Sequence, residues 1–531
     1  MAVSARPDID VKVRLVLLGA LTLLSGYLRF TATSFGLPDK FRPDEELVVL
    51  RALDFTQDWN PHFAIYPAAQ MYLDHAVLRG YAMLSGNDSD FRLSFSANRG
   101  TLAYLVARRT SAVLGTVTVP AIYLAALPLG PDAALASAAI MALSTLHVRE
   151  SKFATTDSAA VFWLVLSLAM VMRMIRAGRG RDYLLAGFFA GVATATKYSA
   201  GAVLFAIIAG HLEGRVREGR SVRESITDPR IYLAGVTALI VFLGLSPYVI
   251  LDWDQTVRDF AYQRQYFLNG VPNPLASYGW TWMLLHAAPD SYGYALMFLF
   301  LIVLAWAFLS QKPGTPTLLV FIAACVIPLL LSRWLFYRYL LFPLPGLALL
   351  AGAFLSDLVE SAGHRLDSTS ARASVFAGLA LLLSPSALSD LELNNLLSRD
   401  DTRTIARKWI EANIPSGSSI AVTVPPDAMP YGKPQLSRNY RYVPMQSLDL
   451  LRRQGVGWVL SDSLPAIAYW SKGMSSGELV ALEFGATEML DIDPRTGSAA
   501  RYDPADAYYA PIANISASER PGPRIRIWKL K

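Results

Sequence analysis

Three carboxylates next to helix starts are the side chains in this sequence best suited to chemistry. Asp44 and Glu45 follow Pro43 shortly after the first apolar segment, and Asp157 begins a later apolar segment. A carboxylate at such a place can accept a proton from an incoming hydroxyl group. The alternative for Asp157 is a helix N-cap, and the alternative for Asp44 and Glu45 is the acidic first turn of a helix.

Basic side chains occur at the same level of the chain's predicted topology. Arg149, Lys152, Lys197, Arg333 and Arg338 each lie at or just inside the outer end of a predicted membrane span. Such a group predicts a bound anion, and a lipid phosphate fits. The alternative is that each cation snorkels to the interface or pairs with a loop carboxylate. Carboxylates beside these cations suit group transfer from a phosphate leaving group, because the cations stabilise the departing charge.

The elements that must position these groups are membrane helices. The chain has 531 residues, of which 53% are hydrophobic and 17% charged, and its mean hydropathy is +0.34. This composition excludes a soluble multidomain enzyme. The net charge of +6 comes largely from arginines in short loops between apolar segments, where they orient a membrane protein, so a nucleic-acid partner is not expected.

Apolar segments near bilayer-crossing length recur from residue 13 to residue 390. Hydropathy and charge predict about eleven spans. They cover residues 13–30, 103–127, 132–147, 157–174, 183–196, 199–212, 231–251, 293–310, 316–332, 338–356 and 372–390. Residues 31–102 form a long first outer loop, in which residues 62–84 are expected to be interfacial helices.

Orientation follows from arginine-rich loops at residues 173–181 and 215–230, which are expected to face the cytoplasm. The segment between them must then enter and return as a hairpin with Lys197 at its outer tip. The alternative is one long tilted span that buries Lys197, at a cost of about 2.5 to 3.5 kcal/mol on insertion scales. The hairpin places residues 31–102, 148–156, 252–292, 333–337 and the C-terminal domain outside.

Residues 391–531 are expected to form a small soluble α/β domain. Hydropathy falls there, and turn signals are followed by short β-rich pieces at residues 420–424, 458–461 and 525–530. The single cysteine, Cys325, lies in an apolar segment, so the chain forms no internal disulfide. The domain organisation is therefore 1–390, membrane domain, and 391–531, extracytoplasmic domain.

Other chemistries find little support in the sequence. The six histidines lack metal-ligand spacing, and there is no Walker A motif or Gly-x-Ser-x-Gly elbow. No cofactor is expected, although Asp44, Glu45 and Asp157 leave a divalent cation possible. His147 suits either an interfacial position or a contact with substrate.

Several motifs, in this order, resemble those of the GT-C membrane glycosyltransferases, in particular the protein O-mannosyltransferase and aminoarabinose-transferase type. The first is Phe41-Arg42-Pro43-Asp44-Glu45, which is similar to the family's Pro-Asp-Glu motif in the first outer loop. The others lie at residues 60–67, 107–116, 147–157, 195–198, 336–343 and 401–415. The resemblance covers most of the chain, and Lys152 stands where many relatives have histidine.

The resemblance implies an inverting transfer of a sugar from a polyprenyl-phosphate donor to a hydroxyl acceptor outside the membrane. It implies that Asp44 is the general base, that Glu45 assists and that Asp157 orients the site. The implied donor-binding residues are Arg149, Lys152, Lys197, Tyr198, Arg333, Tyr337 and Arg338, with His147 and Tyr66 as acceptor or sugar contacts.

The sequence thus predicts a polytopic α-helical membrane protein with a GT-C-like fold and a small C-terminal α/β domain. Its expected partners are the lipid-linked donor and membrane lipid, and its expected location is a bacterial inner membrane. A transporter or flippase of a lipid-linked or anionic solute is the alternative, but such proteins place charges at midplane between repeated halves, and no repeat is visible. A scaffold role for the C-terminal domain is a further alternative.

Overall fold

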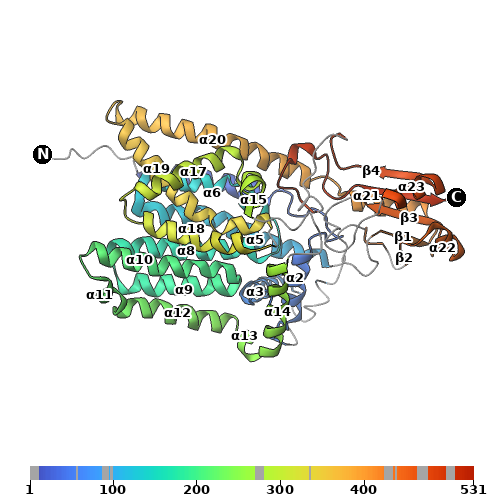
Figure 1. The fold of residues 1–531 in the computed structure, drawn as a ribbon, viewed down its shortest axis with the longest axis horizontal. Coiled ribbons are helices and arrows are strands. Elements are labelled where there is room, and N and C mark those ends of the chain that lie inside the picture. The colour runs from blue at the N-terminus through green and yellow to red at the C-terminus, as the bar shows by residue number, and fades with distance from the viewer. Residues whose placement is uncertain are drawn as a thin grey trace.

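A long helical bundle carries a small sheet domain at one end (Figure 1). The computed structural model describes residues 11–55, 58–86, 95, 100–269, 280–333, 336–423, 434–436, 439–462, 476–497 and 509–531. The mostly helical architecture and the small C-terminal sheet confirm the predicted fold class.

Each predicted span corresponds to a helix. They are α1 (Val11–Phe30), α5 (Thr101–Ala126), α6 (Pro131–Ala142), α8 (Thr156–Ala177), α9 (Gly180–Thr196), α10 (Val203–Arg217), α12 (Pro229–Leu245), α17 (Tyr294–Leu309), α18 (Thr315–Leu331), α19 (Leu344–Ala362) and α20 (Ser368–Leu397). In the described part of the chain, 7 helices are long and apolar enough to cross a membrane, or up to 8 if the bent pair that ends in α17 is one span. The protein is therefore an integral membrane protein.

The bundle core lies between helices that are apolar on every side. Small residues of α6, such as Ala133 and Ser137, meet α19, where a Cβ on Gly352 would lie 2.3 Å from the Ser137 hydroxyl. By contrast, α1 and α12 expose most of their apolar surface at the edge of the bundle, as helices that face lipid do.

Shorter elements gather where the bundle faces the sheet domain. They include α2 (Pro43–Asp54), α3 (Ala69–Leu84), α7 (Thr145–Glu150), α13 (Tyr248–Leu251), α14 (Trp253–Asn269), α15 (Trp280–Trp282), α16 (Ala288–Tyr292) and the short turns η4 (Tyr198–Ala202), η5 (Met283–Ala287) and η6 (Tyr337–Leu341). The opposite end carries η3 (Leu127–Leu129) and α11 (Val222–Ile226). The interfacial helix expected over residues 62–84 begins only at Ala69, because His62 has a φ of 46° and Pro67 interrupts the segment.

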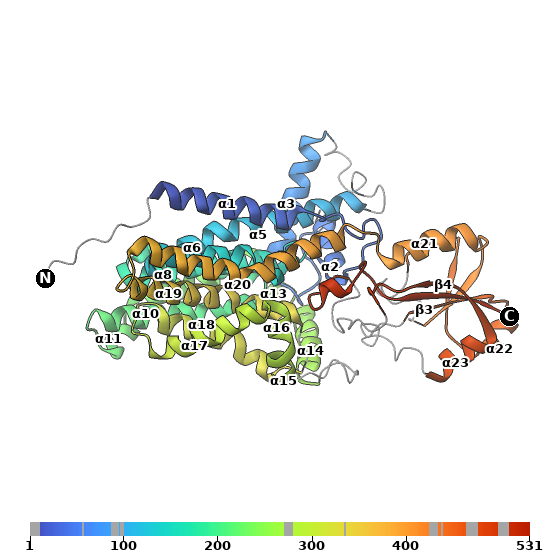
Figure 2. The same cartoon turned by 90° about the horizontal axis from the view of Figure 1, so that it is seen from above.

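The C-terminal domain is a five-stranded sheet with helices on both faces (Figure 2). Its elements are α21 (Thr402–Asn413), β1 (Ser419–Val422), β2 (Arg441–Pro444), α22 (Leu448–Arg453), β3 (Trp458–Asp462), α23 (Ser476–Gly485), β4 (Ala486–Ile492), η8 (Ile515–Ala517) and β5 (Ile525–Leu530). The strand order is β2-β1-β3-β5-β4; β1 pairs in parallel with β2 and β3, and β5 runs antiparallel to β3 and β4. The register pairs Asp462 at the end of β3 with Ile525 at the start of β5.

Candidate active site

Asp44 and Arg338 meet at the end of the bundle that faces the sheet domain. Pro43 occupies the first helical position of α2, so Asp44 falls in its first turn, and Arg338 belongs to η6 just before α19. Asp44 Oδ2 lies 2.9 Å from Arg338 Nη1, and their side chains are 18% and 11% exposed. A carboxylate and a guanidinium that are far apart in the sequence thus form one partly accessible ion pair.

A second ion pair joins Asp157 and Lys197. Lys197 lies in the extended break between α9 and η4, and its Nζ is 2.5 Å from Asp157 Oδ1 in the first turn of α8. The hairpin of α9 and α10 is therefore present, but its tip is buried: Lys197 is only 7% exposed. The N-cap of α8 is Thr155, without a side-chain capping bond, so Asp157 serves the lysine and does not cap the helix.

Aromatic side chains hold the two pairs in a common site. Lys197 Nζ lies 5.7 Å from the centre of the Tyr66 ring and 5.9 Å from that of Tyr339. Burial alone would lower the pKa of the Arg338 guanidinium, but the nearby carboxylate of Asp44, and less strongly that of Asp157, raises it well above its usual range. Burial raises the pKa of the Tyr339 phenol to about 12, so it stays protonated as a hydrogen-bond donor.

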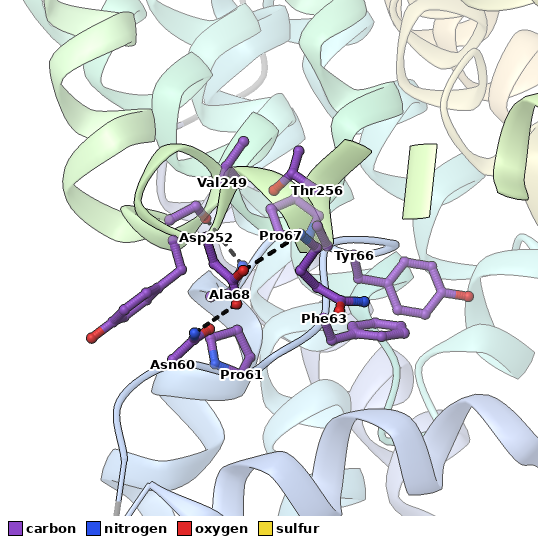
Figure 3. Close-up of a pocket in the computed structure, with 13 residues that line it drawn as sticks. Asn60, Pro61, Phe63, Tyr66, Pro67, Ala68, Val249, Asp252 and Thr256 are labelled. Carbon is purple, nitrogen blue, oxygen red and sulfur yellow. Dashed lines mark hydrogen bonds between the residues drawn. The ribbon is translucent and has the colours of Figure 1, made fainter. Parts of the chain in front are cut away.

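The loop that carries Tyr66 is fixed against α13 and α14. Asn60 Nδ2 donates to Asp252 Oδ2 at 2.8 Å, the Ala64 amide donates to Asp259 Oδ2 at 2.6 Å, and the Ala68 amide donates to the Ser246 hydroxyl at 3.0 Å. A small cavity remains between this loop and α13, and Tyr66 points away from it (Figure 3). Asn60, Ala64 and Ala68 therefore anchor the loop on one side while Tyr66 faces the ion pairs on the other.

Glu45 does not share the position of its neighbour. Both carboxylate oxygens of Glu45 accept hydrogen bonds from Arg108 of α5 at 2.7 Å, and one also accepts the Ala154 amide at 2.8 Å. Glu45 and Arg108 are fully buried. These contacts occupy the Glu45 carboxylate and support a structural role, so the expected assistance in catalysis has no geometric support.

Arg149 is also engaged elsewhere. Its guanidinium donates to Glu150 and, twice, to the carbonyl oxygen of Ala510 in the C-terminal domain, at 3.1 and 2.6 Å. Arg149 is completely buried. The geometry therefore sets it apart from the donor-binding group to which the sequence assigned it.

Lys152 and His147 lie behind the site, against α1. Lys152 Nζ donates to the carbonyl oxygens of Leu28 and Thr31, the latter at 2.8 Å, and His147 Nδ1 lies 2.7 Å from Arg29 Nη2. Burial lowers the pKa of Lys152 to about 7 and that of His147 well below its usual value. Both side chains are fully buried and contact other protein groups, which supports a structural position and not a contact with donor, acceptor or sugar.

The remaining predicted contacts lie around the rim. The Tyr198 hydroxyl donates to the Ala64 carbonyl at 3.1 Å, which ties η4 to the Tyr66 loop. The Tyr337 hydroxyl donates to Asp290 at 3.3 Å, and its ring is buried. Arg333 is exposed, and its amide donates to Phe267 of α14. These three residues frame the site, while Asp44, Asp157, Lys197, Arg338 and Tyr66 form it.

Arg42 and Tyr339 were missed by the sequence reasoning. Arg42 lies two residues before Asp44, is 1% exposed, and its Nη2 donates to Glu150 Oε2 at 2.7 Å. Glu150 raises the pKa of Arg42 although burial opposes this. Both residues lie in motifs named above. A charged or aromatic side chain next to Asp44 or Arg338 was the signal in the sequence that could have identified them. Within the described ranges no cluster of three or more histidine, cysteine or acidic side chains could hold a metal ion.

The sequence comparison identifies a glycosyltransferase signature in the first half of the chain. Residues 100–248 match the model of the dolichyl-phosphate-mannose-protein mannosyltransferase family. That segment contains Asp157 and Lys197. The search of curated proteins found no significant match to this chain.

Comparison with solved structures shows how much of the chain shares a known fold. The apo structure of ArnT from Cupriavidus metallidurans matches with a TM-score of 0.51 at 15% identity, over 98% of each chain. The apo oligosaccharyltransferase of Archaeoglobus fulgidus matches with a TM-score of 0.53 at 12% identity, over 98% of this chain and 89% of that one. AglB from the same archaeon, in complex with an inhibitory peptide and a dolichol-phosphate, gives 0.51 at 13% identity over 90% and 72%. This chain therefore has the GT-C fold of these membrane glycosyltransferases, as its ordered motifs predicted.

Proposed function

We propose that this protein is a membrane glycosyltransferase that moves a sugar from a polyprenyl-phosphate donor to a hydroxyl group of an acceptor. The observation that carries the proposal is the meeting of the Asp44–Arg338 and Asp157–Lys197 pairs at one end of the bundle. The mannosyltransferase signature and a structural relative bound to a dolichol-phosphate support a lipid-phosphate donor.

In the proposed reaction the donor phosphate binds at Arg338 and Lys197. A phosphate competes with the carboxylates for these cations through strong charge-assisted hydrogen bonds. Binding at Arg338 would release Asp44 from its ion pair while keeping it next to the reacting atoms. Asp157 remains to orient Lys197.

The transfer step is a single displacement at the anomeric carbon. The acceptor oxygen forms a bond to that carbon, the bond from the carbon to the phosphate oxygen breaks, and the acceptor proton passes to Asp44. The phosphate leaves with the bonding electrons, and Arg338 and Lys197 stabilise its added charge. Because attack and departure occur on opposite faces, the configuration inverts.

The proposed side of the membrane for the two ion pairs follows from the loop charges. The arginine-rich loops at residues 173–181 and 215–230 face the cytoplasm under the positive-inside rule, which puts the two ion pairs and the sheet domain outside. A bacterial inner membrane suits this arrangement. There a lipid-anchored donor reaches the site laterally, while a polar acceptor arrives from the aqueous side.

The test is transfer by the purified protein. It is incubated with a panel of polyprenyl-phosphate sugars, with and without chelator, and mass spectrometry identifies the donor consumed. Asp44→Asn should lower turnover by about two to four orders of magnitude, because general-base help is worth that much. Asp54→Asn, at the exposed end of the same helix, is the matched control and should keep full activity.

Near-normal turnover by correctly folded Asp44→Asn would remove Asp44 from the mechanism. Failure of the wild-type protein to consume any donor of the panel, together with movement of a lipid-linked solute across vesicles, would favour a transporter instead.

A further inference from the structure

We infer that the C-terminal domain holds the segment that carries Asp44 in place, with Tyr509 as a positioning residue, and we call this set of contacts the grip. The catalytic side of this inference rests on the proposed function. The grip itself is a statement about contacts and can be tested without turnover. It has two parts, one from α21 and one from the segment around Tyr509.

The first grip is on residues 39–41. The guanidinium carbon of Arg403 lies 3.7 Å from the centre of the Phe41 ring. Arg407 Nε lies 3.2 Å from Asp39 Oδ1, and the Thr404 hydroxyl donates to Asp39 Oδ2 at 3.0 Å. Asp39 and Phe41 are each 1% exposed. Two neighbouring turns of α21 thus cover the chain just before Pro43.

The second grip is on Arg42. Tyr509 is 2% exposed, and its ring centre lies 4.8 Å from the guanidinium carbon of Arg42 and 4.9 Å from that of Arg149. The Phe153 ring covers Arg42 at 3.9 Å and meets the Tyr509 ring edge-on at 5.6 Å. The guanidinium of Arg42 is therefore enclosed by two aromatic rings, and one of them belongs to the C-terminal domain.

A buried charge network fixes this arrangement. Glu150 accepts hydrogen bonds from Arg42 on one oxygen and from Arg149 on the other, and Arg149 donates to the Ala510 carbonyl next to Tyr509. Buried charges of this kind tolerate little displacement, because each lost contact leaves an unpaired group without water. The segment from Tyr509 to Ala510 is thus locked onto α7 and Arg42 together.

The position of Arg42 helps to determine the position of Asp44. Only Pro43 separates them, and its ring fixes the backbone φ, so a shift of Arg42 cannot be absorbed easily before the first turn of α2. A carboxylate that accepts a proton must stay within hydrogen-bond reach of the acceptor, and a displacement of about 1 Å can cost about 100-fold in rate. The grip therefore affects catalysis through geometry, with Tyr509 outside the reacting atoms.

The experiment uses the full-length protein and four variants. Tyr509→Ala removes the ring, and Tyr509→Phe keeps it. Arg407→Met weakens the first grip at a side chain that is 18% exposed. Tyr440→Ala is the control, since Tyr440 packs in the same domain on the side of α21 that faces the sheet. Hydrogen exchange of residues 39–46 and steady-state kinetics with the lipid-linked donor are measured for each.

Tyr509→Ala should lower kcat at least about 10-fold with a donor KM within about 2-fold of wild type. Exchange at residues 39–46 should rise. Tyr509→Phe should have the kcat and the exchange of wild type. Arg407→Met should lower kcat and raise exchange, each by less than Tyr509→Ala. Tyr440→Ala should leave residues 39–46 protected. Should Tyr509→Ala fail to fold, Arg407→Met and Tyr509→Phe still carry the test.

The inference is overturned if exchange at residues 39–46 is unchanged in both Tyr509→Ala and Arg407→Met, or if Tyr440→Ala raises it equally. It is also overturned if exchange rises while kcat stays at the wild-type value. An inactive wild-type protein with the expected exchange pattern would contradict the proposed function and leave the grip standing, so the two failures are distinguishable.

Discussion

Two neighbouring carboxylates, Asp44 and Glu45, have opposite environments because a helix separates successive side chains by about 100°. Asp44 faces the accessible pair with Arg338, whereas Glu45 turns inward to Arg108 and the Ala154 amide. The sequence marks both as an acidic first turn and cannot tell them apart. Only the packing of α2 on α5 decides which one faces the site.

Substitution of Glu45 should therefore affect folding before chemistry. Removing one partner of a buried ion pair costs about 3–5 kcal/mol, so Glu45→Gln should lower the thermal unfolding midpoint clearly in detergent. Glu46→Gln, one residue further on and only half-buried, should change stability by less than about 1 kcal/mol. An unchanged midpoint combined with lost turnover in Glu45→Gln would return Glu45 to the catalytic group.

Among single residues, the sequence grouped Lys197 and Arg338 with other cations that the structure places elsewhere. Lys197 and Arg338 come together at one end of the bundle, and each has a carboxylate partner. Arg149 and Lys152 stand on and just after α7, a helix of six residues that is buried on all sides. Periodicity cannot assign a facing side to so short a helix, so their true partners, a carbonyl oxygen of Ala510 and those of α1, stayed hidden.

At the level of elements, each span that hydropathy predicted contains a helix, but hydropathy did not predict how the helices contact each other. The α9–α12 contact depends on Gly187 and Gly191, four residues apart on one face of α9. An added Cβ would lie 2.2 Å from the Ala234 carbonyl oxygen at Gly187 and 2.6 Å from that of Ala238 at Gly191. Small residues at this spacing let two membrane helices approach closely, and a hydropathy profile does not register them.

Gly191→Ala should consequently separate α9 and α12 in their halves nearer Lys197. Overpacking of this kind costs about 1–3 kcal/mol, and the shift should reach Lys197 at the end of α9, so both the unfolding midpoint and donor affinity should fall. Gly244→Ala, where an added Cβ meets nothing within 4 Å, is the control on α12 and should be neutral. Equal midpoints for the two variants would show that the contact tolerates the methyl group.

For the whole molecule, the sequence predicted the two-part organisation and three of the five strands, β1, β3 and β5. These strands lie in the middle of the sheet, and most of their residues are buried. The edge strands β2 and β4 were missed because their residues are half exposed, with polar side chains breaking the apolar pattern. The return of the chain at Tyr509 onto α7 was not predictable either, since only folded coordinates bring that segment to Arg42.

The sheet domain also carries a buried acid at the end that faces the membrane domain. Asp462 ends β3, is 7% exposed and accepts a hydrogen bond from the Thr423 hydroxyl at 3.1 Å. Burial raises the pKa of Asp462 from 3.8 to about 7. The folded state therefore holds a proton that the unfolded state releases between these two pH values, and stability must fall across that window.

Asp462→Asn should remove this dependence. The stability that the protonated acid contributes is present in full below pH 3.8 and is lost as the pH rises through about 7. The shift of about three units corresponds to at most about 4 kcal/mol, so above pH 8 the variant should unfold at a higher temperature than wild type. The difference in unfolding midpoint should shrink steadily as the pH approaches 4. Asp449→Asn, at a side chain that is 82% exposed in α22, should follow wild type at every pH. A pH-independent difference between Asp462→Asn and wild type would mean that the effect comes from the lost bond to Thr423 and not from the proton.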